Sequence, residues 1–280
     1  MLDNRKIAFV GPGMMAEAMV SGLLDKDALP AAKITMSGPR ESRLEGLAES
    51  YQVATSTDNV QAVDGADVVV LSVKPQTMPI VLSELEGQVE EGALVLSIVA
   101  GARLRTISGG LLHAAVVRAM PNTPAQVGEG ISVWTATEDV SEEQREQAAH
   151  ILGSFGQELF VEDEDYLDMA TALSGTGPSY VYLFMEAMVD AGVHLGFPRR
   201  IAEQLVVQTV RGSVAYYEHS PRHMARLRNQ VTSPGGTSAE ALYYLEKAGF
   251  RTALSRAIWA AYERSVQLGR GRKRGGVDQD

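Results

Sequence analysis

Cysteine is absent from the 280-residue sequence, which excludes disulfide bonds, thiol nucleophiles and cysteine-ligated metal sites. Basic residues are also scarce: 25 lysines and arginines face 35 acidic residues, and the net charge of −10 argues against a broad nucleic-acid surface. No apolar run approaches the roughly 20 residues that a transmembrane helix needs. We therefore expect a cytoplasmic protein that binds neither nucleic acid nor membrane. The basic tail at residues 270–274 is the local exception; it is typical of a solvated terminus, and we assign it no role.

Strand and helix patterns alternate over the first 164 residues. Apolar strand runs occupy residues 7–10, 34–36, 66–73, 93–99 and 114–120. Continuous runs of this kind are typical of parallel strands that are covered on both faces. The alternation predicts an α/β Rossmann domain over residues 1–164, with a doubly wound, mainly parallel sheet.

Only helical patterns follow residue 166. They occupy residues 178–195, 198–217, 222–230, 238–247 and 251–268. These patterns predict an all-α domain over residues 165–280. The segment 180–193, YVYLFMEAMVDAGV, is apolar around its whole circumference, and so small a domain gives it limited cover. This favours burial against a second subunit over a self-contained bundle, and we expect a homodimer through the helical domain.

A glycine-rich elbow follows the first strand and leads into a helix, as a dinucleotide fingerprint requires. Its first glycine makes the turn, its second lets a pyrophosphate approach the backbone, and its alanine allows close packing of helix and strand. Amides at the helix start then face the phosphates. The predicted cofactor residues of this elbow are Gly11, Pro12, Gly13, Met14, Met15 and Ala16.

The residues after the second strand indicate which dinucleotide is bound. An NAD site usually has an acidic residue there for the ribose 2′-hydroxyl, whereas this chain has Ser37-Gly-Pro-Arg40. Ser37 and Arg40 suit a 2′-phosphate, so we expect NADPH, with NADH as a weaker donor. Glu41 opposes this prediction, and the alternative is that Arg40 and Arg43 are solvated helix charges.

Three later segments also follow strands, and a doubly wound sheet binds ligands at that edge. They are residues 72–75, 99–101 and 120–124. The last contains the rigid turn Pro-Asn-Thr-Pro, which would place Asn122 against the nicotinamide amide or the substrate. Asn122 would look the same if it only formed the turn.

A second elbow, SPGGTS at residues 233–238, contains no acid, base or metal ligand. It offers hydroxyls and backbone N–H groups at a helix start, which predicts a socket for a small carboxylate. Thr237 to Glu240 also match a capping box, with Thr237 as the N-cap.

None of the five histidines lies in either elbow or at a metal-ligand spacing. This disfavours a hydroxy-acid dehydrogenase, because alcohol oxidation needs a base. A ring imine can arrive protonated, and its reduction needs only an oriented hydride donor and a held carboxylate. Hydroxyls of Thr237 or Ser238 would then bond the ring nitrogen or relay a proton. No metal site is expected.

Together these motifs resemble the pyrroline-5-carboxylate reductase family, from about residue 6 to residue 269. The resemblance rests on GPGMMAEAM, SVKP, RAMPNTPA, LSGTGPSYV and above all VTSPGGTSAEAL followed by LEKAGFR. It implies NADPH-dependent reduction of Δ1-pyrroline-5-carboxylate to L-proline, the last step of proline biosynthesis. It also implies a helical domain that dimerises and often builds larger rings, with active sites that combine residues of both subunits.

The resemblance further implies site residues. Those for the cofactor are Gly11 to Ala16, Ser37, Asn59, Ser72, Val73, Lys74, Pro75, Val99 and Ala100, to which the strand-end argument adds Arg40 and Asn122. Those for the substrate are Ser233, Gly235, Gly236, Thr237 and Ser238, with Asn122 and Glu218 as further candidates. Glu218 precedes Pro221 as an acidic residue can in this family, although the segment that follows is longer than usual.

Three positions depart from the family pattern: Ser238 replaces a commoner threonine, Asn229 a common acidic residue, and Glu240-Ala241 a common Ala-Gly. They bear on the fine geometry of the substrate site. Two alternatives remain open, a reductase of another cyclic imino acid and a catalytically silent NADP-binding regulator. The intact second elbow argues against the regulator.

Overall fold

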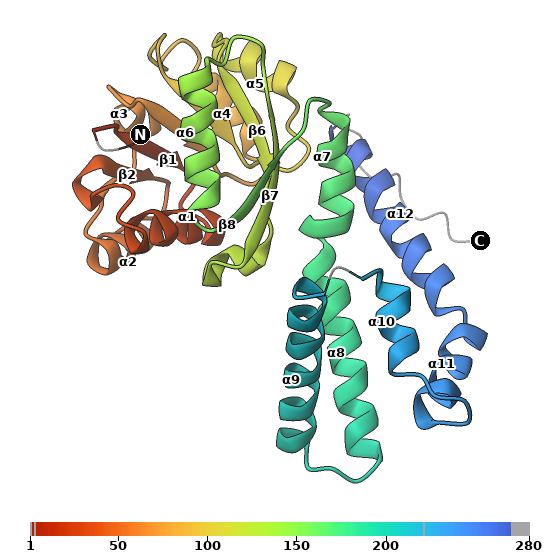
Figure 1. Cartoon of the computed structure of the whole chain (residues 1–280). Helices are drawn as coiled ribbons and strands as arrows, with labels where there is room; N and C mark the ends of the chain where they lie inside the picture. Colours follow the sequence, from red (N-terminus) through yellow and green to blue (C-terminus); the bar gives the residue numbers. More distant parts are fainter. Residues whose placement is uncertain (1, 3, 221, 270–280) are drawn as a thin grey trace, which may run out of the picture. The chain divides into compact units, whose positions relative to one another are not determined.

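The computed structural model describes residues 2, 4–220 and 222–269, and the chain divides into two compact units (Figure 1). The first unit comprises Met1–Thr176 and Ala261–Asp280, and the second comprises Gly177–Ala260. Helix α12 (Phe250–Gly269) therefore contributes residues to both units. The basic tail at 270–274 lies outside the described residues.

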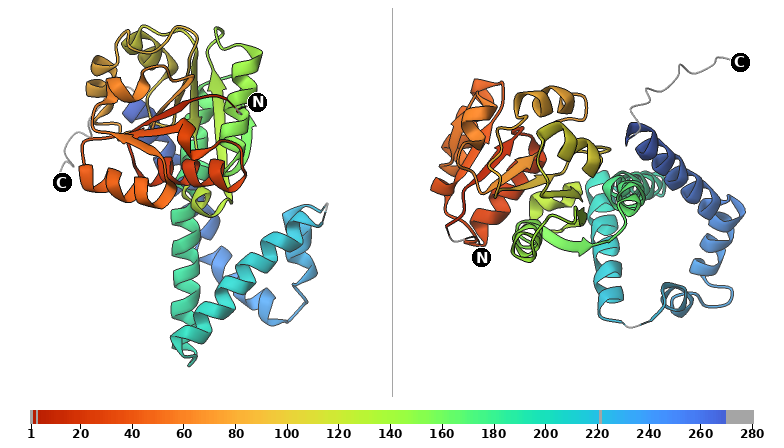
Figure 2. Two further views of the ribbon diagram at one scale, coloured as in Figure 1. Left: turned by 90° about the vertical axis from the view of Figure 1, so that its left-hand side faces the viewer. Right: turned by 90° about the horizontal axis from the view of Figure 1, so that it is seen from above.

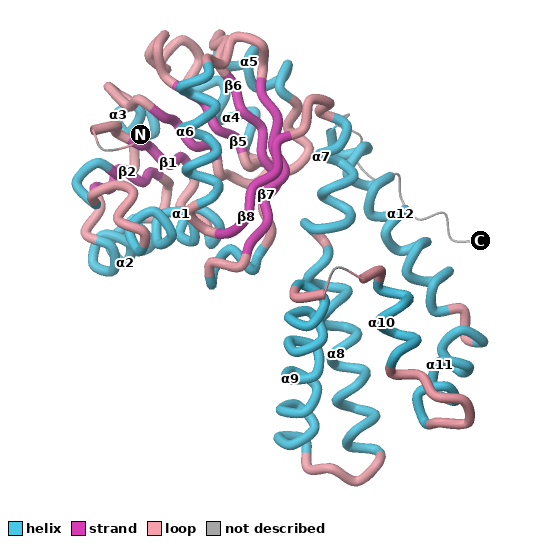
Figure 3. Tube along the Cα trace, in the orientation of Figure 1, coloured by secondary structure: helices cyan, strands magenta, loops and turns pink. Residues whose placement is uncertain are grey.

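The first unit contains one eight-stranded sheet in the order β3-β2-β1-β4-β5-β6-β7-β8 (Figure 3). The first six strands in the chain are parallel, whereas β7 runs antiparallel to β6 and β8 runs parallel to β7. The predicted doubly wound, mainly parallel sheet is confirmed. The strands are β1 (Ile7–Val10), β2 (Ile34–Ser37), β3 (Ala54–Ser56), β4 (Val68–Leu71), β5 (Leu94–Ser97), β6 (Val116–Met120), β7 (Gly130–Ala136) and β8 (Gly156–Phe160).

Helices cover both faces of this sheet (Figure 2). Successive strand residues point to opposite faces, so Phe9 joins the apolar cluster under α1 and α6, and Val10 joins the cluster under α4 and α5. This double cover explains why the central strands read as continuous apolar runs. The helices of this unit are α1 (Met14–Asp25), α2 (Glu41–Tyr51), α3 (Asn59–Val63), α4 (Met78–Glu84), α5 (Leu104–Leu111), α6 (Glu142–Gly153) and α7 (Asp165–Ala170). Short 3₁₀ turns at Ala31–Lys33 and Thr123–Val127, a π-helical turn at Thr171–Gly175 and the last part of α12 complete it.

The second unit is entirely helical among the described residues. Helices α8 (Gly177–His194) and α9 (Arg199–Glu218) pack on each other through a small core around Val189, Ala202 and Val206, and they open at an angle from their connecting turn (Figure 2). Helices α10 (Met224–Gln230), α11 (Thr237–Lys247) and the first part of α12 follow. Each of these helices begins within two residues of its predicted start.

Large apolar side chains stay exposed on α8 and α9, as the sequence of α8 indicates. Tyr182 is 63% exposed, Leu183 66%, Leu205 50% and Val214 55%. A monomer rarely leaves so many apolar side chains of one helix pair in water, so this surface fits an interface with another subunit. Among the described residues, no helix combines the length and hydropathy that a bilayer crossing demands.

Candidate functional site

The predicted cofactor residues gather at one edge of the sheet, where the parallel strands β1, β2, β4, β5 and β6 end. In this sheet β1 lies between β2 and β4, so the strand order reverses on either side of it. Ligands of doubly wound sheets bind beyond the carboxyl ends of the strands at such a switch point. The fold therefore brings together segments 11–16, 37–40, 72–75, 99–101 and 120–124 around one crevice edge.

The first elbow has the backbone of a phosphate cradle. Gly11 adopts φ +104°, and a Cβ there would lie 2.8 Å from the carbonyl carbon of Ser72 and from the nitrogen of Val73. Gly13 is the N-cap of α1, with no side-chain cap. Within the described chain, the amides of Met14 and Met15 donate to no protein acceptor. The residues present thus fit a bound pyrophosphate, because the helix start keeps its N–H groups and positive dipole end open.

Two contacts hold this elbow in place. A Cβ on Gly38 would lie 2.4 Å from Cδ of Pro12, so the turn after β2 packs directly on the elbow. Arg43 donates from Nε to the Pro12 carbonyl oxygen over 3.1 Å and forms an ion pair with Glu17. Arg43 is therefore committed to the protein and is not a free cation for a 2′-phosphate.

The side chains near the expected 2′-position form a chain of hydrogen bonds. The buried Ser37 hydroxyl donates to Oδ1 of Asn59 over 2.8 Å, and Nδ2 of Asn59 donates to Glu84 over 2.7 Å. Arg40 is exposed at the N-cap of α2, where its carbonyl oxygen accepts from the amides of Arg43 and Leu44, and within the described residues its guanidinium makes no hydrogen bond or ion pair. Its guanidinium is therefore available to a ligand near the expected position of the ribose 2′-phosphate.

The carboxamide of Asn122 makes two intramolecular hydrogen bonds. Its Oδ1 accepts from the amide of Ile131 over 2.9 Å, and its Nδ2 donates to the Ser174 carbonyl oxygen over 3.3 Å. Asn122 thus joins the end of β6 to the start of β7 and to the π-helical turn. Its predicted contact with a ligand stays a prediction, for which one N–H and one oxygen lone pair of the carboxamide remain available.

The second elbow, in the second unit, keeps its hydrogen-bonding groups open. The amides of Thr237 and Ser238 donate to no acceptor in the described chain, and the hydroxyls of these residues make no hydrogen bond there either. The capping box predicted with Thr237 as N-cap is wrong. Helix α11 begins one residue earlier than that box requires, with Gly236 as its N-cap and no side-chain cap, so Thr237 is already helical. This start frees two hydroxyls and two amides for a ligand.

Glu218 ends α9 and is exposed, and no hydrogen bond or ion pair links it to residues 233–238 within the described part of the chain. Its predicted substrate role therefore gains no support from the structure. No group of three or more potential metal-ligating side chains is found among the described residues.

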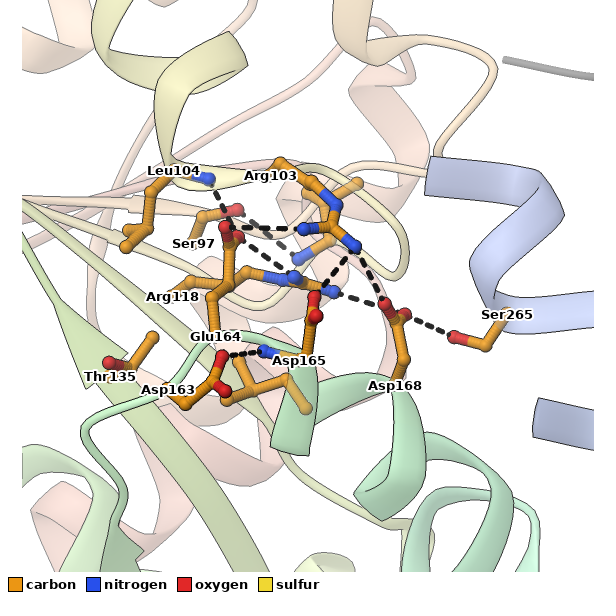
Figure 4. Close-up of polar contacts among 12 residues, drawn as sticks. Ser97, Arg103, Leu104, Arg118, Thr135, Asp163, Glu164, Asp165, Asp168 and Ser265 are labelled. Carbon is orange, nitrogen blue, oxygen red and sulfur yellow. Dashed lines mark hydrogen bonds and ion pairs between the residues drawn. The ribbon is translucent and has the colours of Figure 1, made fainter. Parts of the chain in front are cut away.

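Sequence reasoning missed an ion cluster, buried at Arg118 and Asp168, beside the turn at residues 120–124 that follows β6, here called the β6 turn (Figure 4). Arg118 on β6 is 2% exposed and stands in register between two buried polar residues, Ser97 of β5 and Thr135 of β7. Its guanidinium lies 2.8 Å from Glu164 and 3.6 Å from Asp168. The signal was one arginine inside an apolar run, since a buried charge requires a partner, and the acidic run at 162–165 could supply it.

A second arginine completes the cluster. Arg103 lies 2.9 Å from Asp165 and 3.4 Å from Asp168. Burial lowers the pKa of the Arg103 guanidinium, but hydrogen bonding to Asp165 and the neighbouring carboxylate charges outweigh it, and the pKa stands above its ordinary value. On the far side, the Ser265 hydroxyl of α12 donates to Asp168 over 2.7 Å.

Two family models match the chain. One, described as pyrroline-5-carboxylate reductase dimerisation, matches residues 164–268. The other, described as NADP oxidoreductase coenzyme F420-dependent, matches residues 6–101.

Individual relatives match nearly the whole length. The chain is 40% identical to pyrroline-5-carboxylate reductase of Synechocystis sp. (95% of this chain, 98% of that protein) and 39% identical to that of Pseudomonas aeruginosa (95% and 98%). Among solved structures, pyrroline carboxylate reductase of Plasmodium falciparum with NADP bound superposes with a TM-score of 0.87 at 31% identity (95% and 98%). The Coxiella burnetii enzyme gives 0.87 at 36% identity (94% and 98%).

Proposed function

The chain belongs to the pyrroline-5-carboxylate reductase family, and from this premise we propose how it reduces Δ1-pyrroline-5-carboxylate to L-proline. The observation that supports the proposal is the presence of two helix starts with open amides, one at Gly13 and one at Gly236. Each suits an anion: the first a pyrophosphate, the second a carboxylate.

The first elbow would hold the dinucleotide across the crevice edge of the sheet. With the pyrophosphate at α1, Ser37, Arg40 and Asn59 would hold the adenosine half, because the residues after β2 of such a sheet meet the ribose. The ends of β4, β5 and β6 would then border the nicotinamide. The bound nicotinamide supplies the hydride, and the protein supplies orientation.

The second elbow would hold the substrate carboxylate by the amides of Thr237 and Ser238. The two hydroxyls of these residues would then be available to the ring nitrogen of the held imine. Thr237, which is exposed, is our candidate for the hydrogen bond to that nitrogen, with Ser238 beside it. Such a site lowers the barrier mainly by fixing the reacting atoms in contact, so no histidine is needed.

The family's dimerisation model and the exposed apolar side chains of α8 and α9 agree on a homo-oligomer. We further propose that dimers form through these helices, and that a larger ring of dimers is built on them.

Turnover tests the proposed function directly. We expect the purified protein to oxidise NADPH with Δ1-pyrroline-5-carboxylate, and to act at least about tenfold more slowly on its six-membered homologue, since one methylene changes specificity by roughly 10- to 200-fold. The measurement is the fall in NADPH absorbance with each imine. Faster turnover of the larger ring would reassign the substrate, and tight NADPH binding without turnover of either would make the protein a regulator.

Cofactor preference depends on Arg40 in this proposal. Arg40→Ala is expected to raise the KM for NADPH about 10- to 100-fold and leave the KM for NADH nearly unchanged, because a hydrogen bond to a charged group contributes about 1.5–3 kcal/mol. Arg43→Ala is the comparison: it loosens the Pro12 carbonyl contact and should weaken both cofactors alike. An unchanged NADPH-to-NADH ratio in the Arg40 variant would refute the assignment.

A further inference from the structure

The ion cluster of Arg103, Arg118, Glu164, Asp165 and Asp168, in which Arg118 and Asp168 are buried, lies next to the turns where the nicotinamide is expected. Arg118 is two residues before Met120, where β6 ends, and Arg103 follows the turn at residues 99–101 after β5. Both turns thus follow strands, β5 and β6, whose ends are expected to border the nicotinamide. This placement rests on the proposed function.

The cluster holds the β6 turn through α7 and the π-helical turn. Arg118 pairs with Glu164 and Asp168, at the two ends of the first turn of α7. The chain then forms the π-helical turn, where a Cβ on Gly175 would lie 2.8 Å from Cε of Met120 and where the Ser174 carbonyl accepts from Asn122. The β6 turn is therefore fixed at two places: at β6 by the ion pairs of Arg118, and at Met120 and Asn122 by the π-helical turn.

The same cluster holds the β5 turn and the last part of α12. Glu164 accepts from the amide of Leu104 over 2.8 Å and so caps α5, the helix that follows the β5 turn. Ser265 of α12 donates to Asp168. Four residues on, the end of α12 packs against the β5 turn, where a Cβ on Gly101 would lie 3.1 Å from the Gly269 nitrogen. One set of carboxylates thus sets the position of both turns.

Stability alone does not explain why this spot is charged. Buried ion pairs are often no more stabilising than apolar residues of equal volume. Their hydrogen bonds are directional, however, and so allow only a few relative positions of the segments that they join. We propose that the cluster is a positioning device for hydride transfer: Arg118 and Asp168 fix the β5 and β6 turns, and thereby the nicotinamide, at the distance that the reaction needs.

Asp168→Asn tests this, because it keeps the side chain's size and its bond with Ser265 while it removes the charge that both arginines face. We expect single-turnover hydride transfer to slow about 10- to 100-fold, since small misplacements of reacting groups have effects of this size. The deuterium isotope effect with 4-deuterated NADPH should rise as hydride transfer becomes slower than the other steps. The Kd for NADPH should change less than about threefold, because the pyrophosphate and adenosine contacts remain.

Val117→Ala is the matched control. It opens a cavity in the same strand, at a fully buried position whose side chain belongs to the apolar cluster on the opposite sheet face from Arg118 and takes no part in the ion pairs. An equal loss of hydride-transfer rate in this variant, or an unchanged rate in Asp168→Asn, would overturn the positioning role. If Asp168→Asn does not fold, Ser265→Ala replaces it, and Ser265→Thr should restore the rate because it keeps the hydroxyl. An inactive wild-type enzyme would instead contradict the proposed function.

Discussion

Gly11→Ala is expected to abolish measurable NADPH binding and to lower kcat/KM by about a thousandfold or more. Gly11 stands at φ +104°, where a side chain is strained, and the added Cβ would overlap the backbone of Ser72 and Val73 at 2.8 Å. Backbone atoms cannot rotate away, so the elbow itself must move, and with it the open amides of α1. Strain and overlap of this kind destabilise a fold by about 2–4 kcal/mol. Fluorescence titration with NADPH and thermal unfolding measure the two losses.

Substitutions at two further glycines distinguish a loss of space for the ligand from a loss of fold stability. A Cβ on Gly13 would meet nothing in the protein closer than 3.9 Å, so Gly13→Ala should fold as well as the wild type. If it still weakens NADPH binding, the space it fills belongs to the cofactor. Gly46 in α2 has no heavy atom within 4 Å of such a Cβ, and Gly46→Ala should leave binding intact while it stabilises the helix by about 0.5–1 kcal/mol. Normal NADPH affinity in the Gly11 variant would disprove the cradle.

Gly236→Val is expected to remove productive imine binding while NADPH binding survives. Its Cβ would lie 2.6 Å from the hydroxyl oxygen of Ser233 and 3.1 Å from the Ser233 carbonyl oxygen, which accepts from the Gly236 amide. The turn that aims the Thr237 and Ser238 amides must therefore shift. Loss of two charge-assisted hydrogen bonds, each about 1.5–3 kcal/mol, predicts a fall in kcat/KM for the imine of at least about 100-fold.

The measurement for this variant is steady-state kinetics with varied imine, together with direct titration of NADPH, for which we expect a Kd within about twofold of the wild type. Gly46→Val is the control for an added β-branched side chain, and it should leave both ligands unaffected. Joint loss of NADPH and imine binding in the Gly236 variant would contradict two separate sockets.

The sequence predicts the five central parallel strands well, but not the edge strands β3 and β8 or the antiparallel strand β7. Five apolar runs became β1, β2, β4, β5 and β6, because strands covered on both faces contain little but apolar residues. Strand β3 has three residues and none is buried, and β8 is largely exposed, so neither carries such a run. Strand β7 belongs to the part of the sheet that reverses direction, which apolar content does not encode.

The candidate site was predictable where backbone shape is encoded by glycine and not where it depends on remote partners. Both elbows were located from their glycines. The commitment of Asn122 to Ile131 and Ser174 could not be foreseen, since both partners depend on the folded path of the chain. The division predicted after residue 164 falls within the acidic run at 162–165, where Glu164 is bound to Arg118 within the first unit. That division, proposed after residue 164, stays a prediction.

Because apolar side chains of α8 and α9 are exposed in the single subunit, we expect the stability of this fold to depend on protein concentration. In the proposed dimer, association would hide residues such as Leu183 and Leu205, which the single subunit exposes to water. Mass action then couples folding to association, so that dilution weakens the native state even at constant temperature and pH. A cell that makes too little of the chain would lose more than a proportional share of its activity.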